Sequence, residues 1–430
     1  MKIEELHKLF LAASDITTDS RDAKPDSIFF ALKGDNFDGN KYAEKALEAG
    51  CLYAVIDDDR FKLDERCILV DDVLNTLQQL SRYHRREFNI PILAITGSNG
   101  KTTTKELVSS ILGRNYRIIS TEGNFNNHIG VPLTLLRLKE DTEIGIIELG
   151  ANHPGEISDL CQLAEPTHGI ITNIGHAHIE GFGSFENVIK AKSELYSWLR
   201  NNNGIIFQNL DDEILEGLIQ PEDNLVPYSV YSENLSDFSI VAADPHLEVN
   251  WKYNNKVIPL KTQLFGTYNL QNLVAAISIG LYFDVDENEI KSGTESFSPG
   301  NNRSQVFKTY ENTLILDAYN ANPTSMKAAI ADFQQISAVR KMVILGDMFE
   351  LGEDSLEQHK EIIALLEDMN HFKAYLVGEM FTKASEGTHL RSFPDVDEAS
   401  RYFMSHPVHS STILLKGSRM MSLEKLIPNL

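Results

Sequence analysis

The chain has 430 residues, which is enough for two or three domains with substantial hydrophobic cores. Its content of 42% hydrophobic and 23% charged residues is typical of a globular protein. The formal net charge is −23, from 39 basic and 62 acidic residues, which argues against general binding to nucleic acid or to an anionic membrane. Any acidic ligand would therefore have to meet a local cluster of basic side chains and backbone N–H groups.

The cysteines and the apolar segments suggest where the protein works. Cys51, Cys67 and Cys161 are scattered and form no Cys-x-x-Cys pair, a pattern of a reducing compartment without a structural zinc site. The N-terminal MKIEELHKLFLAAS is acidic where a signal peptide would be basic. The longest apolar stretch, near 273–283, is too short to span a bilayer. We expect a cytoplasmic protein, monomeric and without membrane insertion.

Short strand-like runs alternate with helical stretches along the whole chain, in three sections. The sections are residues 1–87, 88–298 and 299–430, and residues 221–261 look like an insertion or an antiparallel extension within the second. The alternation predicts an α/β protein whose mainly parallel sheets are covered on both faces. The expected strands are Ser27–Leu32, Leu52–Ile56, Ile68–Val70, Ile92–Thr96, Ile144–Leu149, Gly169–Thr172, Ile205–Gln208, Leu314–Ala318, Met342–Leu345, Tyr375–Val377 and Thr412–Leu415.

The segment PILAITGSNGKTTTKEL, residues 91–107, predicts a phosphate-binding loop. An apolar strand, a Gly-rich turn and a helix start in succession let backbone N–H groups converge on an anion. Lys101 would reach the outer phosphates, and the hydroxyl of Thr102 suits Mg²⁺. The loop is the short Gly-x-x-Gly-Lys-Thr, since Ile95 stands where the standard pattern has its first glycine. This spacing points away from GTPases and motor ATPases.

Two further features suggest a metal site. Glu148 ends the apolar run IGIIE, and ligands of parallel sheets gather at the carboxyl ends of strands. In the helix expected between Ser184 and Gly204, Lys192 falls near the centre of the apolar stripe. Such a lysine either extends its amine to solvent or is buried with a lowered pKa, and a neutral amine can take up CO₂ to form a metal-binding carbamate.

Polar residues also follow several later strands and helix starts. Asn272 opens an apolar helix, where an amide can cap the helix or bind a nucleotide edge, and Arg303 lies where the third section begins. Asp317, Asp347 and Lys416 each end an expected strand of that section. Polar strand ends repeated in one sheet indicate one shared ligand-binding edge.

Taken together, these motifs resemble those of the ATP-dependent Mur ligases. The segments TGSNGKT, IELGANHPGEI and AHIEGFGS look like the family's central ATPase domain. DAYNANPTSM, LGDMFELG and KGSRMM look like its Rossmann-like C-terminal domain, and TDSRDAKPDSIFFALKGDNFDGN like its uridine-nucleotide-binding N-terminal domain. The resemblance covers the whole chain and implies three α/β domains with the limits given above.

The resemblance implies a set of site residues. Lys101, His178, Lys192 and Arg303 would be catalytic, and two Mg²⁺ ions would be bound by Thr102, Glu148, His178 and a carbamylated Lys192. The uridine diphosphate would meet Ser20, Arg21, Lys33 and Gly34. The ATP-binding residues would be Gly97, Ser98, Asn99, Gly100, Lys101, Thr102, Thr103, Asn272, Arg303, Asp317, Tyr319 and Asn320.

Two positions depart from the family pattern. Arg303 lies in GNNRSQ, where many relatives have a compact Gly-Arg pair. The family's Asp-Gly-His reads Asp38-Gly39-Asn40 here, so no ligand role is assigned to Asn40. A metal ligand near Asn126 to His128 is likewise not assigned.

The implied activity is the ATP-dependent addition of D-alanyl-D-alanine to UDP-N-acetylmuramoyl-tripeptide, through an acyl phosphate. The nearest alternative is the sister ligase that adds the third-position diamino acid, but its Asp-Asn-Pro-Arg tetrapeptide is missing from this sequence. A folate polyglutamating ligase would lack the uridine-binding section. A non-catalytic nucleotide-binding regulator would not need Lys101, Glu148, His178 and Lys192 together.

Overall fold

The structure, a computed structural model, describes all residues except 177–178, 232–236 and 370–371. The chain divides into two compact units: residues 1–94, 117–150 and 156–167 form unit 1, and residues 95–116, 151–155 and 168–430 form unit 2. No helix in the described part of the chain is long and apolar enough to cross a membrane.

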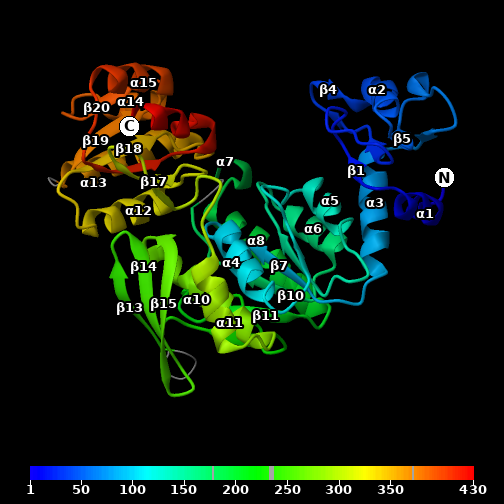
Figure 1. The fold of residues 1–430 in the computed structure, drawn as a ribbon, viewed down its shortest axis with the longest axis horizontal. Helices are drawn as coiled ribbons and strands as arrows, with labels where there is room; N and C mark the ends of the chain where they lie inside the picture. Colours follow the sequence, from blue (N-terminus) through cyan, green and yellow to red (C-terminus); the bar gives the residue numbers. More distant parts are fainter. Residues whose placement is uncertain (177–178, 232–236, 370–371) are drawn as a thin grey trace. The chain divides into compact units, whose positions relative to one another are not determined.

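Unit 1 is built around a four-stranded parallel sheet with the strand order β1-β2-β5-β6 (Figure 1). A side chain of Asp72 caps α3, and Val73, Leu77 and Leu80 recur at helical spacing on its buried face. The elements are α1 (Ile3–Ala12), β1 (Ile16–Thr17), β2 (Ile28–Phe30), β3 (Lys33–Gly34), β4 (Phe37–Asp38), η1 (Gly39–Tyr42), α2 (Ala43–Glu48), β5 (Tyr53–Ile56), η2 (Asp59–Phe61), β6 (Cys67–Leu69), α3 (Val73–Arg86), β8 (Ile118–Ser120), α5 (Gly130–Leu135), β9 (Ile144–Glu148) and α6 (Glu156–Ala164).

The first part of unit 2 carries the phosphate-loop segment. Strand β7 (Ile92–Thr96), whose last residues belong to this unit, leads into α4 (Lys101–Leu112), and β10, β11 and β12 continue the sheet on one side of it. An antiparallel three-stranded sheet, β13-β14-β15, follows (Figure 1). It confirms the antiparallel character expected in 221–261, except that β12 in this range pairs parallel with β11. The other elements are α7 (Ile179–Phe182), α8 (Phe185–Asn201), β10 (His168–Ile171), β11 (Ile205–Asn209), α9 (Glu213–Glu216), β12 (Asn224–Tyr228), β13 (Asp237–Ala243), β14 (His246–Tyr253), β15 (Lys256–Phe265), η3 (Thr267–Asn269), α10 (Leu270–Tyr282) and α11 (Glu287–Ser296).

The last part of unit 2 is a second α/β sheet of six strands, β16-β17-β21-β18-β19-β20. All its pairings are parallel except that of β16 with β17. Its elements are β16 (Gln305–Lys308), β17 (Thr313–Asp317), α12 (Pro323–Gln335), β18 (Lys341–Gly346), η4 (Gly352–Asp354), α13 (Ser355–Glu367), β19 (Lys373–Val377), α14 (Glu379–Ala384), β20 (Arg391–Phe393), α15 (Val396–Ser405), β21 (Thr412–Lys416), η5 (Arg419–Met421) and η6 (Leu423–Asn429).

The α/β class and the expected strands are confirmed, each strand within two residues at either end. The strands that the sequence did not predict include β1, β3 and β4, which have two residues each. Such pieces are too short for an alternating pattern to show. The limits 1–87, 88–298 and 299–430 stay a prediction.

Asp347, which directly follows β18, has a structural role. Its carboxylate accepts hydrogen bonds from the backbone N–H groups of Met380, at 2.9 Å, and Phe381, at 2.8 Å, at the start of α14. The side chain is 3% exposed, and a Cβ at Gly378 would lie 2.2 Å from its carboxyl carbon. The neighbouring His359 accepts from Met348 N–H and donates to Ser355 O, and burial lowers its pKa, so it stays neutral. Asp347 thus joins β18 to α14.

Replacing Asp347 should therefore destabilise the C-terminal sheet. Asp347→Ala leaves two buried N–H groups without their charged acceptor, and we expect a loss of about 2–3 kcal/mol in the free energy of unfolding. Urea unfolding followed by circular dichroism measures it. The exposed Asp354, which makes no side-chain cap of α13, is the matched control, and Asp354→Ala should change stability by less than about 0.5 kcal/mol. An equal effect of both substitutions would contradict this account.

Candidate functional site

The loop between β7 and α4 has no room for side chains at its two glycines. Gly97 and Gly100 have positive φ angles, 144° and 80°. A Cβ on Gly97 would lie 2.0 Å from Thr172 Oγ1, and one on Gly100 would lie 2.3 Å from Asn272 Oδ1. The loop thus packs closely between the end of β10 and the start of α10. This packing holds the N–H groups of the loop in one arrangement.

The loop ends at the N-terminus of α4, a helix of 12 residues. Its first N–H groups and its dipole favour an anion at this end. The amine of Lys101 lies back over the loop, where it donates to Gly97 O at 2.5 Å and to Ser98 O at 3.2 Å. The predicted strand, turn and helix start are confirmed as local structure, and they form a site of the kind that binds phosphate.

A cavity of about 620 Å³ opens next to this loop within unit 2. It is lined by ten of the twelve predicted ATP-binding residues, all except Gly97 and Tyr319. Val230, Tyr231 and Ile240 add an apolar part, and Asn322, Thr324 and Lys416 add polar groups. Clefts of this size with a few converging polar groups are typical small-molecule sites.

The C-terminal sheet supplies the charged wall of the cavity. Lys416, 2% exposed, pairs with Asp317 across neighbouring strands at 2.5 Å, and Asp317 also accepts from the N–H of Ser304 at 3.1 Å. Tyr268 lies close by with its hydroxyl 2.9 Å from Ser304 Oγ. Burial, and after it the charge of Asp317, raises the pKa of Tyr268 far above its usual value, so the hydroxyl stays neutral.

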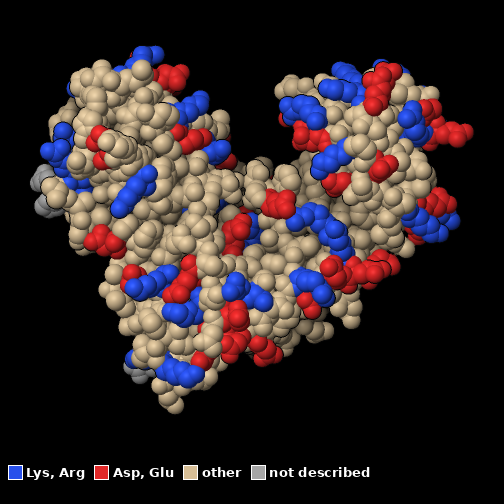
Figure 2. All heavy atoms as spheres, viewed as in Figure 1, with Lys and Arg blue, Asp and Glu red and all other residues tan. Residues whose placement is uncertain are grey.

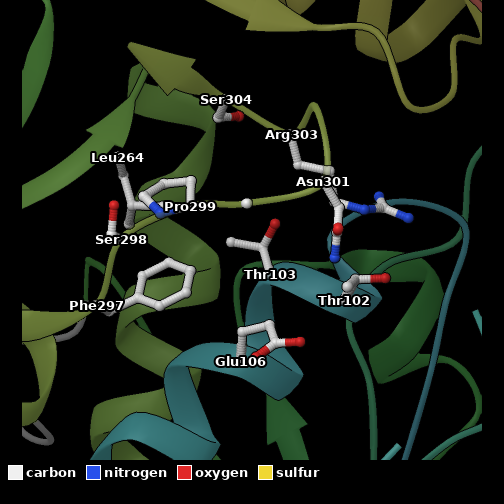
Figure 3. Close-up of a pocket in the computed structure, with 11 residues that line it drawn as sticks. Thr102, Thr103, Glu106, Leu264, Phe297, Ser298, Pro299, Asn301, Arg303 and Ser304 are labelled. Atoms are coloured by element: carbon white, nitrogen blue, oxygen red, sulfur yellow. The ribbon is translucent and has the colours of Figure 1, made fainter. Parts of the chain in front are cut away.

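Arg303 lies on the segment between α11 and β16. Its guanidinium carbon is 3.6 Å from the ring centroid of Tyr319, a cation–π contact that orients the side chain. Arg303 and Thr102 both line a second cavity of about 150 Å³, in which Thr103 and Glu106 project from α4 and Pro299 and Asn301 face them (Figure 3). The structure therefore brings Arg303 to the helix end that follows the phosphate loop.

Lys192 is buried in α8, a helix that Ser184 caps as expected. Only 1% of the residue is exposed, and its amine lies 5.5 Å from the ring centroid of Phe182. Of the two alternatives that the sequence left open, an amine extended to solvent is excluded. The other predicted residue of this region, His178, lies outside the described residues.

Glu148 lies in unit 1 with an unusual set of contacts. Its backbone N–H donates to Thr121 Oγ1 at 2.9 Å, and its Oε1 accepts from Asn126 Nδ2 at 2.8 Å. Its Oε2 is buried and has no hydrogen-bond partner in the described part of the chain, although the residue is 1% exposed. A buried carboxylate oxygen left open in this way is suited to a cation.

Two of the four residues predicted for the uridine nucleotide, Arg21 and Lys33, form ion pairs in unit 1. Arg21 pairs with Asp19 at 2.5 Å, and the hydrogen bond from Arg21 lowers the pKa of Asp19 to about 2. Lys33, beside Gly34 in β3, pairs with Asp57 at 2.7 Å. Ser20 is 9% exposed. Arg21 and Lys33 are exposed and so can reach a ligand.

Asn40 proves to be the buried centre of the second ion pair. Its amide nitrogen donates to Asp57 at 2.8 Å and to Asp38 at 2.9 Å, and its oxygen accepts from the N–H of Asp57 at 3.0 Å. Burial by itself would raise the pKa of Asp57, but the hydrogen bonds from Lys33 and Asn40 outweigh it and leave that pKa lowered. Asn40 thus orients the carboxylate of Asp57, which in turn pairs with Lys33.

On the face shown in Figure 2, acidic and basic side chains lie interspersed among the described residues. The positive groups that line the cavity are instead Lys101, Arg303, Lys416 and the start of α4. The expectation that an acidic ligand needs a local cluster of donors agrees with this arrangement.

Comparisons with known proteins decide the family. Family models match residues 13–85 (Mur ligase family, catalytic domain), 95–280 (Mur ligase middle domain) and 302–419 (Mur ligase, glutamate ligase domain). The UDP-N-acetylmuramoyl-tripeptide--D-alanyl-D-alanine ligase of Bacillus subtilis is 34% identical over 96% of this chain and 92% of its own length. The chain belongs to the Mur ligase family.

Solved structures agree with this placement. A crystal structure of MurF from Acinetobacter baumannii matches with a TM-score of 0.87 and 28% identity, over 100% of this chain and 98% of the other. The MurF ligase of Thermotoga maritima, crystallised with ADP, has a TM-score of 0.84 over 98% and 97% of the two chains at 24% identity, which shows the shared fold. This Mur ligase therefore has the three-domain architecture of its relatives.

Several residues of the site escaped the sequence analysis. The sequence identified Lys416 only as a polar residue at a strand end. In the sheet, β21 lies next to β17, and this neighbourhood pairs Lys416 with Asp317. Asn173 and Asn322 gave no signal beyond their polarity. Both contact Asn99 of the phosphate loop, and these contacts join positions that are far apart in the sequence of this Mur ligase.

The role of Asn40 can be tested by unfolding. Asn40→Ala leaves the N–H of Asp57 without its acceptor and removes one donor each from Asp38 and Asp57, and we expect a loss of about 1–3 kcal/mol in the free energy of unfolding. Urea unfolding at pH 7 measures it. The nearby Asn36 is exposed, and Asn36→Ala should leave stability unchanged. Unaltered stability of Asn40→Ala would show that the network contributes nothing.

Proposed function

We propose that this chain joins D-alanyl-D-alanine to UDP-N-acetylmuramoyl-tripeptide with the hydrolysis of ATP to ADP and phosphate. It is an ATP-dependent ligase that forms a carbon–nitrogen bond in peptidoglycan precursor synthesis. The observation that carries the assignment is the match, over nearly the whole chain, to relatives named for this reaction. The phosphate loop that opens onto a cavity of about 620 Å³ supports the use of ATP.

ATP occupies that cavity, with its phosphates at the loop from Gly97 to Thr103. The loop N–H groups and the amine of Lys101 bind the phosphate oxygens, and Arg303 binds the γ-phosphoryl group. Asn272 meets the adenine, and Asp317, Tyr319 and Asn320 lie toward the ribose. Asn272, Asp317 and Asn320 all line the cavity, which supports these roles.

Two Mg²⁺ ions would be held by the four residues expected for them. Glu148 offers a buried oxygen with no other partner among the described residues, and the hydroxyl of Thr102 is a hard oxygen ligand. His178 and Lys192 complete the set, with Lys192 as a carbamate. A carbamate changes the buried amine from a cation into an anion, which explains how a lysine on an apolar face can bind a metal. When bound, the ions neutralise charge on the phosphates and on the attacking carboxylate.

The reaction has two steps, and both take place in the same site. The terminal carboxylate of the tripeptide attacks the γ-phosphorus of ATP, so that an acyl phosphate forms and ADP leaves. The amine of D-Ala-D-Ala then attacks the acyl carbon, the C–O bond to phosphate breaks, and the amine gives up its proton. Lys101 and Arg303 bind the phosphoryl group and reduce the repulsion between the two anions. The walls of the cavity keep water from the acyl phosphate.

The uridine diphosphate of the first substrate is bound in unit 1 by Ser20, Arg21, Lys33 and Gly34. Arg21 and Lys33 are exposed, and each is held by one carboxylate, so both can accept a second anion. The three domains, 1–87, 88–298 and 299–430, bind the nucleotide sugar, bind ATP and close the site, respectively. We expect a cytoplasmic monomer that binds small-molecule substrates and neither nucleic acid nor membrane.

One assay tests the reaction and its alternatives. Purified protein should release phosphate from ATP with UDP-N-acetylmuramoyl-tripeptide and D-Ala-D-Ala, and mass spectrometry should show the UDP-pentapeptide. The same protein with the UDP-dipeptide and a diamino acid should release none. Lys101→Ala should lower kcat by roughly 10²–10³-fold, because one charged donor to the transferred phosphoryl group is lost. The exposed Lys139 provides a control, Lys139→Ala.

The outcomes separate the candidates. Release only with the second substrate pair would assign the chain to the sister ligase. ATP binding with no release in either reaction would favour a nucleotide-binding regulator. Full ligase activity of Lys101→Ala would overturn the role given to the loop.

The carbamate of Lys192 can be detected directly. In ¹³C-bicarbonate we expect a carbamate carbon signal from the wild-type protein that disappears in Lys192→Ala and persists in Lys190→Ala. Lys190 lies on the same helix and is exposed, whereas Lys192 is buried, so Lys190→Ala is the matched control. A signal that survives Lys192→Ala would place the modification elsewhere.

A further inference from the structure

Asn322 makes contacts in two directions at the start of α12. Its Oδ1 accepts from the N–H of Ser325 at 2.9 Å, and its own N–H donates to Ser325 Oγ at 3.1 Å, which together cap the helix. Its Nδ2 donates to Oδ1 of Asn99 at 2.8 Å. The side chain is 6% exposed, so these bonds are shielded from water.

Asn99 belongs to the phosphate loop and is held from a second side as well. Its N–H donates to Asn173 Oδ1 at 3.0 Å. Its carbonyl oxygen accepts from Thr172 Oγ1 at 2.6 Å and from Asn173 Nδ2 at 3.0 Å. The backbone of Asn99 is thus fixed by the end of β10, and its side chain is free to serve as the acceptor for Asn322.

The two functions of Asn322 depend on each other. Because Oδ1 must face the N–H of Ser325, the planar amide directs Nδ2 away from the helix, toward Asn99. Rotation of the amide would give up the cap and the contact together. A single rigid side chain therefore links the orientation of α12 to the phosphate loop.

This link has a consequence for the cavity. Asp317 and Asn320 precede α12 in the chain, and Lys416 pairs with Asp317 in the next strand. All three line the cavity whose other wall is the phosphate loop. A shift of α12 relative to Asn99 would move these groups with respect to ATP.

We propose that Asn322 is a positioning residue. Its hydrogen bond links α12 to the phosphate loop and so fixes the distance between the two walls of the nucleotide cavity. The proposal rests on the assignment of this cavity to ATP and adds a residue through which the C-terminal sheet acts on it. Asn322 acts through Asn99, and its effect is on ATP affinity.

Three variants separate the cap from the link. Asn322→Ser keeps a good N-cap, but its hydroxyl is too short to reach Asn99. Asn322→Ala loses both the cap and the link, and Asn99→Ala removes the link while α12 stays intact. The readouts are the thermal midpoint, KM for ATP and kcat in the ligase assay, and ATP affinity by calorimetry.

We expect Asn322→Ser to unfold at the wild-type midpoint while KM for ATP rises about threefold to tenfold, the effect of one buried hydrogen bond. Asn322→Ala should show the same rise and a lower midpoint. In a double-mutant cycle, Asn322→Ser should add nothing to the effect of Asn99→Ala, because both remove the same contact.

Two results would overturn the proposal. One is a wild-type KM for ATP in Asn322→Ser, which would leave Asn322 as a helix cap alone. The other is a double variant whose rise in KM for ATP equals the product of the rises in Asn322→Ser and Asn99→Ala, which would mean that the two residues act independently. Failure of the ligase reaction is distinguishable, since calorimetry measures the loss of ATP affinity without the peptide substrates.

Discussion

The absence of space for a side chain at Gly97 and Gly100 is the constraint on which the site depends. Thr172 and Asn272 occupy the places where the two Cβ atoms would lie. The backbone N–H groups of the loop are therefore presented in one geometry before any ligand binds, so binding does not have to order the loop. In a chain of net charge −23, such fixed N–H groups and a helix dipole supply the positive potential that surface charge does not.

Polar residues at the ends of parallel strands serve two purposes in this fold. Asp317 and Lys416 line the nucleotide cavity, whereas Asp347 accepts hydrogen bonds from the start of α14 and holds one helix against one strand. All three looked alike in the sequence. The difference comes from the connection that follows each strand: the chain after Asp347 returns two N–H groups to its carboxylate, and the pairing of Asp317 with Lys416 leaves both on the cavity wall.

The sequence predicted what depends on neighbouring residues. The strands, the phosphate loop, the cap at Ser184 and the apolar stripe that includes Lys192 all follow from patterns within one or two turns or a single strand. It did not predict the bond of Asn322 to Asn99, which joins residues 223 positions apart, or the use of Asn126 by Glu148. These contacts depend on how sheets and helices pack, and an asparagine has the same local signature whether it caps a helix, holds a loop or faces solvent.

Burial of Glu148 and Lys192 costs folding free energy. A carboxylate oxygen with no hydrogen-bond partner among the described residues and a lysine that is 1% exposed both lose hydration on folding, and each loss opposes stability. Hydrophobic residues would fill the same volumes at no such cost. A metal ion would offset the cost by using the open oxygen of Glu148, and a carbamate would remove the buried positive charge of Lys192. The metal role proposed for each residue would account for this cost.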